Sequence, residues 1–256
     1  RDDHCSQLVQ SNDREPEFIP AFQNQKLHDA YLSVVEALSH AGYENSAIID
    51  IKWVDAETVN KDTVDSLLKD CQGILVPGGF GDRGIEGMVC ASNYARVNDI
   101  PYLGVCLGMQ IAVIEYARNV LNMENANSTE FDLETKYPVI ALMPDQFGNI
   151  MGGTMRLGAY PCKVKEKTML HKCYGDLNIS ERHRHRYEFN NDFRTQMIEN
   201  GLTIAGTSPD EKLVEAVEVE KNKFHVGVQY HPEFKSRPNR ANPIFKGFIN
   251  AAVSML

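Results

Sequence analysis

Short apolar runs alternate with amphipathic stretches through the first half of the chain. The apolar run over 74–76 stops at a Pro-Gly-Gly sequence, a pattern typical of a buried strand that ends in a tight turn. Helical spacing follows over 85–97, then a second apolar run over 102–105 and a long amphipathic stretch over 107–120. Strands that alternate with helices over short connections predict a parallel sheet with crossover helices.

A further helix is predicted upstream of this unit. Leu32, Val35 and Leu38 recur at helical spacing. Asp29 stands where an N-cap would lie, and Gly42 stands where the helix would end.

The carboxyl-terminal part of the chain has a different pattern. Apolar runs predict strands over 139–142, 203–205, 213–219 and 224–229. A short polar turn joins the last two, which indicates antiparallel pairing, and Pro243 suits the first turn of a closing helix over 243–255. The predicted fold class is α/β, an open and mostly parallel sheet with flanking helices and appended antiparallel strands.

The composition is that of an ordinary globular protein, with 43% hydrophobic and 24% charged residues in 256. One large domain is expected over 18–256, because α/β domains often reach about 250 residues. Residues 1–17 are polar and lack periodicity, which predicts a tail or the remnant of a linker.

Charge narrows the classes of function. Acidic residues outnumber basic ones by 35 to 26, for a net charge of −9, which argues against binding to nucleic acid or to an anionic membrane surface. The chain has no run of about 20 apolar residues and no secretory signal in 1–17, so we expect a cytoplasmic protein. We expect reduced thiols and no disulfides, since the six cysteines form no C-x-x-C pair: Cys5, Cys71, Cys90, Cys106, Cys162 and Cys173.

One cysteine stands in a motif with chemical meaning. The sequence Gly-Val-Cys-Leu-Gly over 104–108 has the form of a nucleophile elbow, with Cys106 where α/β-hydrolases place serine. A cysteine at a strand-to-helix turn would face the helix dipole, which favours the thiolate. The alternative is that Cys106 is a small buried hydrophobic residue, as free cysteines often are.

A cysteine nucleophile needs a base and donors for an oxyanion. His231 follows a predicted strand, and Glu233 lies two residues on, across a proline, where it can orient the imidazole. Because Gly79 follows the neighbouring predicted strand, we expect its backbone N–H and that of Leu107 to face the same point, where they would bind an oxyanion. Taken separately, each segment could equally be an ordinary turn.

Three segments together resemble the class I (triad) glutamine amidotransferases: Val-Pro-Gly-Gly-Phe-Gly at 76–81, Gly-Val-Cys-Leu-Gly-Met-Gln at 104–110 and Tyr-His-Pro-Glu at 230–233. The segments over 127–131, 152–158 and 181–188 are similar to those of CTP synthases. The resemblance covers about residues 26–256 and implies a flavodoxin-like core. In this family a first strand precedes the first helix, a place that 18–25 occupies here without the expected Gly-Lys-Tyr ending.

The resemblance implies a role for each matching residue. Cys106 would be the nucleophile that forms a glutamyl thioester, His231 the general base and acid, and Glu233 its orienting partner. Contacts with L-glutamine would come from Gly79, Leu107, Gly108, Met109, Gln110, Glu130 and Arg186. No cofactor or metal is implied in this domain.

The resemblance also implies a larger enzyme. CTP synthase, a ligase of pyrimidine biosynthesis, joins its glutaminase domain to a synthetase domain that binds UTP, ATP and Mg²⁺, with GTP as an allosteric activator and a homotetramer as the assembly. This chain contains no Gly-x-x-x-x-Gly-Lys-Ser/Thr phosphate loop. We therefore expect the synthetase domain to be a partner outside it.

Three alternatives stay open at this point. The chain could be the glutaminase of GMP synthetase or a γ-glutamyl hydrolase, or a scaffold domain that keeps the fold without activity. The basic run over 182–186 could mark nucleic-acid contact or a zinc site, but the acidic chain and the lack of ligand spacing favour a strip that contacts the substrate carboxylate and a neighbouring domain.

Overall fold

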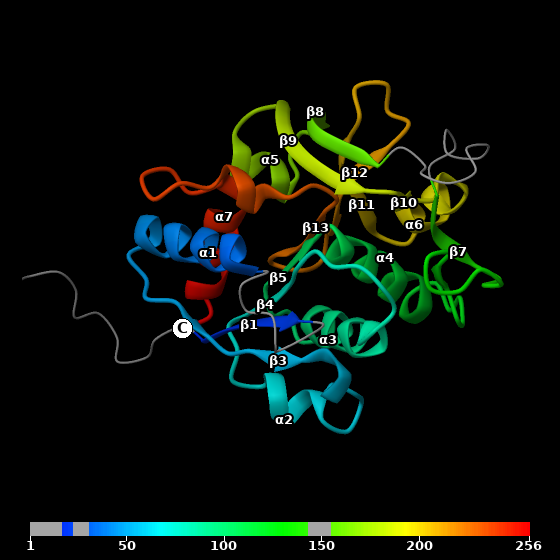
Figure 1. Ribbon diagram of the computed structural model, residues 1–256, viewed down its shortest axis with the longest axis horizontal. Helices are drawn as coiled ribbons and strands as arrows, with labels where there is room; N and C mark the ends of the chain where they lie inside the picture. The colour runs from blue at the N-terminus through cyan, green and yellow to red at the C-terminus, as the bar shows by residue number, and fades with distance from the viewer. Residues whose placement is uncertain (1–16, 23–30, 143–154) are drawn as a thin grey trace, which may run out of the picture.

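A ten-stranded sheet forms the centre of the molecule (Figure 1). The computed structural model describes residues 17–22, 31–142 and 155–256, with 17–22 described as backbone only. Within these residues the sheet runs in the order β2-β1-β4-β5-β13-β12-β11-β8-β9, and β3 also pairs with β1. The strands are β1 (Glu17–Phe22), β2 (Asp50–Ile51), β3 (Val54–Asp55), β4 (Gly73–Val76), β5 (Tyr102–Val105), β8 (Arg156–Val164), β9 (Asn178–His185), β11 (Leu202–Thr207), β12 (Val214–Val219) and β13 (His225–Val228).

The sheet has a parallel half and an antiparallel half. β2, β1, β4, β5 and β13 are parallel, whereas each neighbour pair from β13 through β12, β11 and β8 to β9 is antiparallel. This confirms the predicted fold class. One detail of the prediction was wrong: β13 belongs to the parallel half, where it pairs with β5, besides forming the predicted hairpin with β12.

Two layers of core lie on the two faces of the sheet. In β4, Ile74 and Val76 pack in the layer of α3 and α4, while Leu75 packs in the layer of α1 and α7, as period-2 alternation requires. Figure 1 shows the two pairs of helices on opposite sides of the strands. The helices are α1 (Leu32–Asn45), α2 (Val64–Leu68), α3 (Ile85–Val97), α4 (Leu107–Asn119), α5 (Met169–Tyr174), α6 (Arg194–Glu199) and α7 (Pro243–Val253), with the 3₁₀ turns η2 (Ala56–Thr58), η4 (Asn191–Phe193) and η5 (Pro232–Lys235).

The predicted helices are present, but α1 ends later than predicted, while α4 ends one residue and α7 two residues earlier. α3 has the predicted bounds, and α7 begins at Pro243, where the Asn242 side chain caps it by accepting from the Ile244 N–H at 3.0 Å. α1 continues past Gly42 to Asn45 and ends where Ser46 adopts a φ of 52°. The expected N-cap Asp29 lies outside the described residues. None of the helices described is long and apolar enough to cross a membrane.

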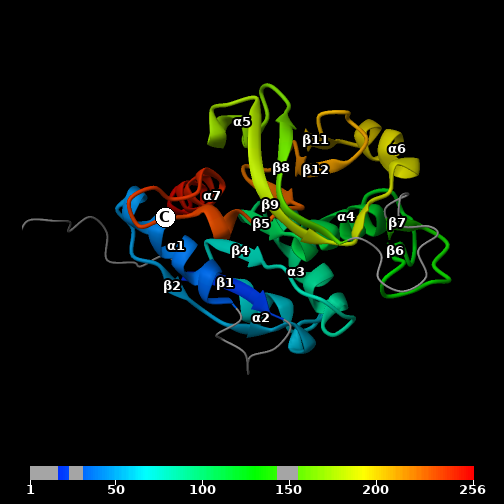
Figure 2. The ribbon, with the colours of Figure 1, turned by 45° about the horizontal axis from the view of Figure 1, so that its top comes forward.

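The larger features that the sequence did not predict are a long strand pair and a second sheet, besides several short helices and strands. β8 and β9 form a long antiparallel hairpin that pairs Arg156 with His185 and Lys163 with Asn178 at its ends (Figure 2). The run over 139–142 is a strand, but it joins a separate three-stranded sheet of β6 (Asn127–Ser128), β7 (Pro138–Leu142) and β10 (Tyr187–Phe189). The first strand, left unidentified by the sequence, is β1, which pairs with both β2 and β4.

Candidate active site

Cys106 occupies a strained turn between β5 and α4. Its backbone has φ 52° and ψ −101°, a conformation that is costly for a residue with a side chain. The flanking glycines explain why the turn is this tight. A β-carbon on Gly104 would lie 2.4 Å from the carbonyl oxygen of Gly108, and one on Gly108 would lie 2.0 Å from that of Val76. The predicted elbow is therefore present, and it holds the cysteine at the amino terminus of a 13-residue helix.

The Cys106 sulfur is enclosed by polar groups. The side chain is 4% exposed, so Cys106 is buried as the alternative interpretation also required. Its Sγ lies 3.7 Å from the amide nitrogen Nε2 of Gln229, which donates to it, and 3.9 Å from the carbonyl oxygen of Arg184. The sulfur thus has a donor and an acceptor beside it, at one end of the hydrophobic layer of α1 and α7.

His231 and Glu233 form a buried pair at the same edge of the sheet. Since β13 runs parallel to β5, the residues after both strands meet at one end. The His231 Nδ1 lies 2.8 Å from the Glu233 Oε1. Burial lowers the pKa of His231, but its interactions with Cys106 and Glu233 outweigh burial and raise that pKa to about 10. The other nitrogen, Nε2, is buried and makes no hydrogen bond of ordinary geometry.

Gly78 brings the third predicted segment against the other two. It follows β4, the neighbour of β5. A β-carbon at Gly78 would lie 2.7 Å from the His231 Cε1 and 3.5 Å from the Cys106 Cβ. The structure thus brings together all three segments that the sequence singled out.

A cavity of about 340 Å³ contains three of the predicted substrate contacts. It is lined by Phe80, Gln110, Glu130, Met155, His185, Arg186 and Tyr187. Leu107, Gly108 and Met109 do not line it. Met109 is fully buried against β13, so any contact of these three residues with a ligand in this cavity would involve the backbone.

Opposite charges face this cavity. Burial raises the pKa of Glu130, while a hydrogen bond from the backbone of Gly81 and the charge of Arg186 act in the opposite direction. A carboxylate and a guanidinium on one small cavity are complementary to a ligand that carries both an ammonium and a carboxylate group.

A buried ionic cluster on β8, β9, β10 and β12 adjoins the cavity, which His185 of the cluster lines. Arg156 Nη1 is 2.6 Å from Glu215 Oε1 and 3.6 Å from Glu188 Oε1. His183 Nδ1 lies 2.9 Å from His185 Nε2, and His183 Nε2 lies 3.6 Å from Glu215 Oε2. Burial raises the pKa of Glu188 to about 8 and that of Glu215 to about 7, and it lowers the pKa of both histidines. His183 and His185 therefore contact each other and the glutamates of the cluster.

Sequence reasoning missed several residues at this site. Phe80, Met155, His185 and Tyr187 line the cavity, and Gln229 contacts the sulfur. Gln229 could have been found, because it directly precedes the Tyr-His-Pro-Glu segment and directly follows β13, the strand next to β5. The others come from loops and strand ends whose positions depend on the tertiary fold.

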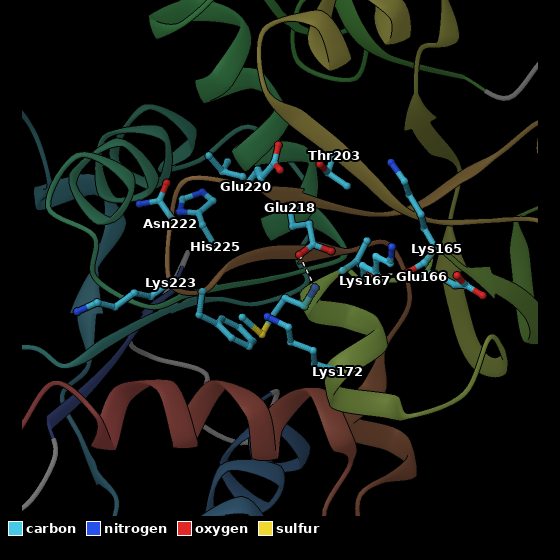
Figure 3. Close-up of a pocket in the computed structure, with 14 residues that line it drawn as sticks. Lys165, Glu166, Lys167, Lys172, Thr203, Glu218, Glu220, Asn222, Lys223 and His225 are labelled. Carbon is cyan, nitrogen blue, oxygen red and sulfur yellow. Dashed lines mark hydrogen bonds between the residues drawn. The ribbon is translucent and has the colours of Figure 1, made fainter.

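A second cavity, of about 570 Å³, lies at the opposite edge of the sheet (Figure 3). It is lined at that edge by His225, the first residue of β13, whereas the sulfur follows the last residue of the neighbouring β5. Lysines and glutamates from β12 and from the segment before α5 surround it, and none of the predicted site residues lies in it. In the described part of the chain, no group of three or more His, Cys, Asp or Glu side chains is arranged to hold a metal.

Comparison of the sequence with known proteins identifies its family. The sequence profile described as "Glutamine amidotransferase class-I" matches residues 26–251. This chain belongs to the class-I glutamine amidotransferase family. The amidotransferase is similar to the CTP synthases of Clostridium kluyveri, with 58% identity over 230 residues, and of Clostridium perfringens, with 60% identity over 230 residues. These matches cover 90% of this chain but 43% of each relative, so the chain spans less than half of their length.

Solved structures of amidotransferases agree in fold. The structure described as the Trypanosoma brucei CTPS glutaminase domain with bound acivicin is 37% identical to this amidotransferase, with a TM-score of 0.88 and coverage of 94% of both chains. A glutamine amidotransferase from Thermotoga maritima has 11% identity and a TM-score of 0.56, covering 94% of this chain and 98% of its own, which shows a shared fold alone.

Proposed function

We propose that this amidotransferase chain hydrolyses L-glutamine to glutamate and ammonia, with Cys106 as the nucleophile. The observation that carries the proposal is the convergence of a strained elbow cysteine with a His231–Glu233 pair joined at 2.8 Å. A nucleophile, a base and a group that orients the base are the parts that acyl transfer through a thioester requires.

The first half of the reaction releases ammonia. His231 accepts the thiol proton of Cys106 at Nε2, and the thiolate attacks the carboxamide carbon of glutamine to form a tetrahedral adduct. The imidazolium then gives its proton to the amide nitrogen, the C–N bond breaks and ammonia leaves. A γ-glutamyl thioester remains on Cys106. Glu233, on Nδ1, holds the imidazole in place and stabilises its charged form.

The second half returns the free enzyme. Water loses a proton to His231 as its oxygen attacks the thioester carbon. The second adduct collapses with cleavage of the C–S bond, and the sulfur takes back its proton from the imidazolium as glutamate leaves. In both halves the backbone N–H groups of Gly79 and Leu107 would bind the oxyanion, supported by the positive end of α4.

Glutamine would be held by charge at its amino-acid end. Glu130 would pair with the ammonium group and Arg186 with the carboxylate, in the cavity that both residues line. The side chain of the substrate would then extend from this cavity toward Cys106. Gln110 lines the same cavity and donates to Gln229, whose amide nitrogen contacts the Cys106 sulfur.

In the whole enzyme, the ammonia would be used to aminate UTP to CTP. Two facts support this: the relatives at 58% and 60% identity are CTP synthases, and the chain matches 43% of their length. The remainder of such a protein would supply the ATP-dependent synthetase domain, with Mg²⁺, an allosteric site for GTP and the contacts of a homotetramer. We also propose that the enzyme acts in the cytoplasm.

Acivicin, the ligand of the trypanosomal structure, tests the nucleophile. We expect one adduct per chain, mapped to Cys106 by mass spectrometry of peptides, and protection by excess glutamine. The Cys106→Ala variant should gain no adduct, and a Cys90→Ala control should be labelled as the native chain is. Labelling spread over the other cysteines, or no labelling, would contradict the proposal.

The fate of ammonia is tested in the full-length enzyme. With Cys106→Ala, CTP should still form from UTP and ATP when ammonium chloride is supplied, and should not form with glutamine. Loss of CTP formation from both nitrogen sources, in a variant with native thermal stability, would contradict the assignment of Cys106 to the glutaminase half-reaction alone.

A further inference from the structure

A chain of hydrogen bonds leads from the backbone of β10 to the reactive sulfur. The Gln110 Nε2 donates to the carbonyl oxygen of Tyr187 at 3.1 Å and to the Oε1 of Gln229 at 3.4 Å. The Gln229 Nε2 in turn lies 3.7 Å from the Cys106 Sγ. Both glutamine side chains are buried, with exposed fractions of 3% for Gln110 and 0% for Gln229.

These hydrogen bonds fix the orientation of both side-chain amides. A backbone carbonyl can only accept hydrogen bonds, so Tyr187 requires the nitrogen of Gln110 on its side. That nitrogen, as a donor, requires the oxygen of Gln229 to face it. The remaining nitrogen of Gln229 must then point at the sulfur. The order of donors and acceptors is set by a group that cannot flip.

The two uncharged neighbours of the sulfur favour different protonation states of Cys106. The carbonyl of Arg184, at 3.9 Å, can accept a proton from the thiol and offers nothing to a thiolate. The amide of Gln229 donates, and a donor is worth most to a charged acceptor in a buried site. The titratable neighbour is His231, with Glu233 on its far nitrogen.

We propose that the Gln229 amide stabilises the thiolate of Cys106, and that Gln110 acts through Gln229 as a positioning residue. When the thiol proton passes to His231, the N–H of Gln229 faces the negative sulfur and no group has to turn. This deepens the glutaminase function and rests on Cys106 being its nucleophile. It gives Gln110 a task besides contact with the substrate.

The test is the pH profile of Cys106 alkylation by iodoacetamide, a small probe that needs no glutamine site. The rate would be followed from pH 5 to 10 by mass spectrometry of the peptide that contains Cys106. In Gln229→Met, which keeps the size of the side chain and removes the donor, the midpoint should move upward by about one pH unit. Gln110→Met should move it in the same direction by less, because it removes the orienting bond alone.

Val226→Ala is the matched control. It removes buried atoms from the same strand without touching the chain of amides, and its midpoint should equal that of the native protein. A native midpoint in Gln229→Met, or an equal shift in Val226→Ala, would overturn the proposal. If Gln229→Met does not fold, a native midpoint in Gln110→Met overturns it instead. A native chain that fails to hydrolyse glutamine would contradict the proposed function, while the alkylation profiles would still decide the role of Gln229.

Discussion

Gly78 lies so close to His231 that a β-carbon at Gly78 would come within 2.7 Å of the imidazole Cε1. The glycine therefore sets the position of the imidazole relative to Cys106, whose Cβ would be 3.5 Å from the same added atom. The space between the two reacting groups contains no room for a methyl group.

We expect Gly78→Ala to displace the imidazole and to lower kcat/KM for glutamine by about 100-fold, the usual effect of a misplacement near 1 Å. Glutamate release measures it. Gly175→Ala is the control: no atom lies within 4 Å of the added carbon, but φ is 66°, so it should cost stability and leave the rate unchanged. Native activity in Gly78→Ala would show that the imidazole position does not depend on this contact.

Glu130 and Arg186 should determine the affinity for glutamine. Glu130→Gln removes the negative charge that would meet the substrate ammonium, so kcat/KM should fall by about 10- to 100-fold through an increase in KM. Glu134→Gln, an exposed neighbour outside the cavity, should be neutral. An unchanged KM in Glu130→Gln would place the amino group of the substrate elsewhere.

The stability of the fold should decrease at alkaline pH because of His231. Its pKa is raised from 6.5 to about 10 in the folded state. Its contribution to the free energy of unfolding is therefore complete below about pH 6.5 and is lost as the pH rises toward 10. Urea unfolding at pH 6, 8 and 10 should show this decline, and His231→Gln should flatten it. An equal decline in both proteins would assign the effect to other groups.

Glu188 should also lower the stability of the fold as the pH rises, over a lower pH range. Burial raises its pKa from 4.5 to about 8, so its ionisation opposes folding increasingly between these pH values. Glu188→Gln should be more stable than the native chain at pH 8.5 and equal to it near pH 4.5, as measured by urea unfolding. The exposed Glu220→Gln, with the same change in charge, should show no such dependence on pH. If Glu188→Gln is less stable at pH 8.5, the carboxylate is a net stabilising partner of Arg156.

The sequence predicted the parts of the fold that follow the simplest physical rules. β4, α3, β5 and α4 were predicted almost to the residue, because their apolar positions follow the period of a buried strand or an amphipathic helix. The three segments of the candidate site were predicted to meet because each follows a predicted strand, although the strand before His231 was assigned to the antiparallel part of the sheet. Whether Cys106, His231 and Glu233 carry out the proposed chemistry stays a prediction.

β9 was missed because its buried face is polar. Glu181, His183 and His185 are buried while Arg182 and Arg184 between them are exposed, so the period of 2 is present in burial but absent in hydrophobicity. Charged and imidazole side chains are rarely buried unless they are paired. His183 pairs with Glu215, which is distant in sequence, and His185 pairs with Glu188, three residues further along the chain. The partner of His183 could not be predicted from the local sequence.

α1 does not end at Gly42, although glycine is the residue type that commonly ends a helix. Gly42 has the residue type of a helix end, but a β-carbon there would lie 2.8 Å from the Ala47 oxygen and 2.8 Å from the Ile49 side chain. Glycine is needed at position 42 because the segment that follows α1 packs closely against the helix there. The residue with left-handed backbone geometry that ends the helix is Ser46, four residues later.

The place of β13 in the middle of the sheet has a consequence for synthesis of the protein. This strand is the last of the main sheet to leave the ribosome, yet it lies between β5 and β12. Until it arrives, the facing edges of these two strands have no partner in a growing chain. Cys106 is translated 125 positions before His231. Under the proposed function, a chain cut short before that histidine would lack the base for Cys106 and should not hydrolyse glutamine.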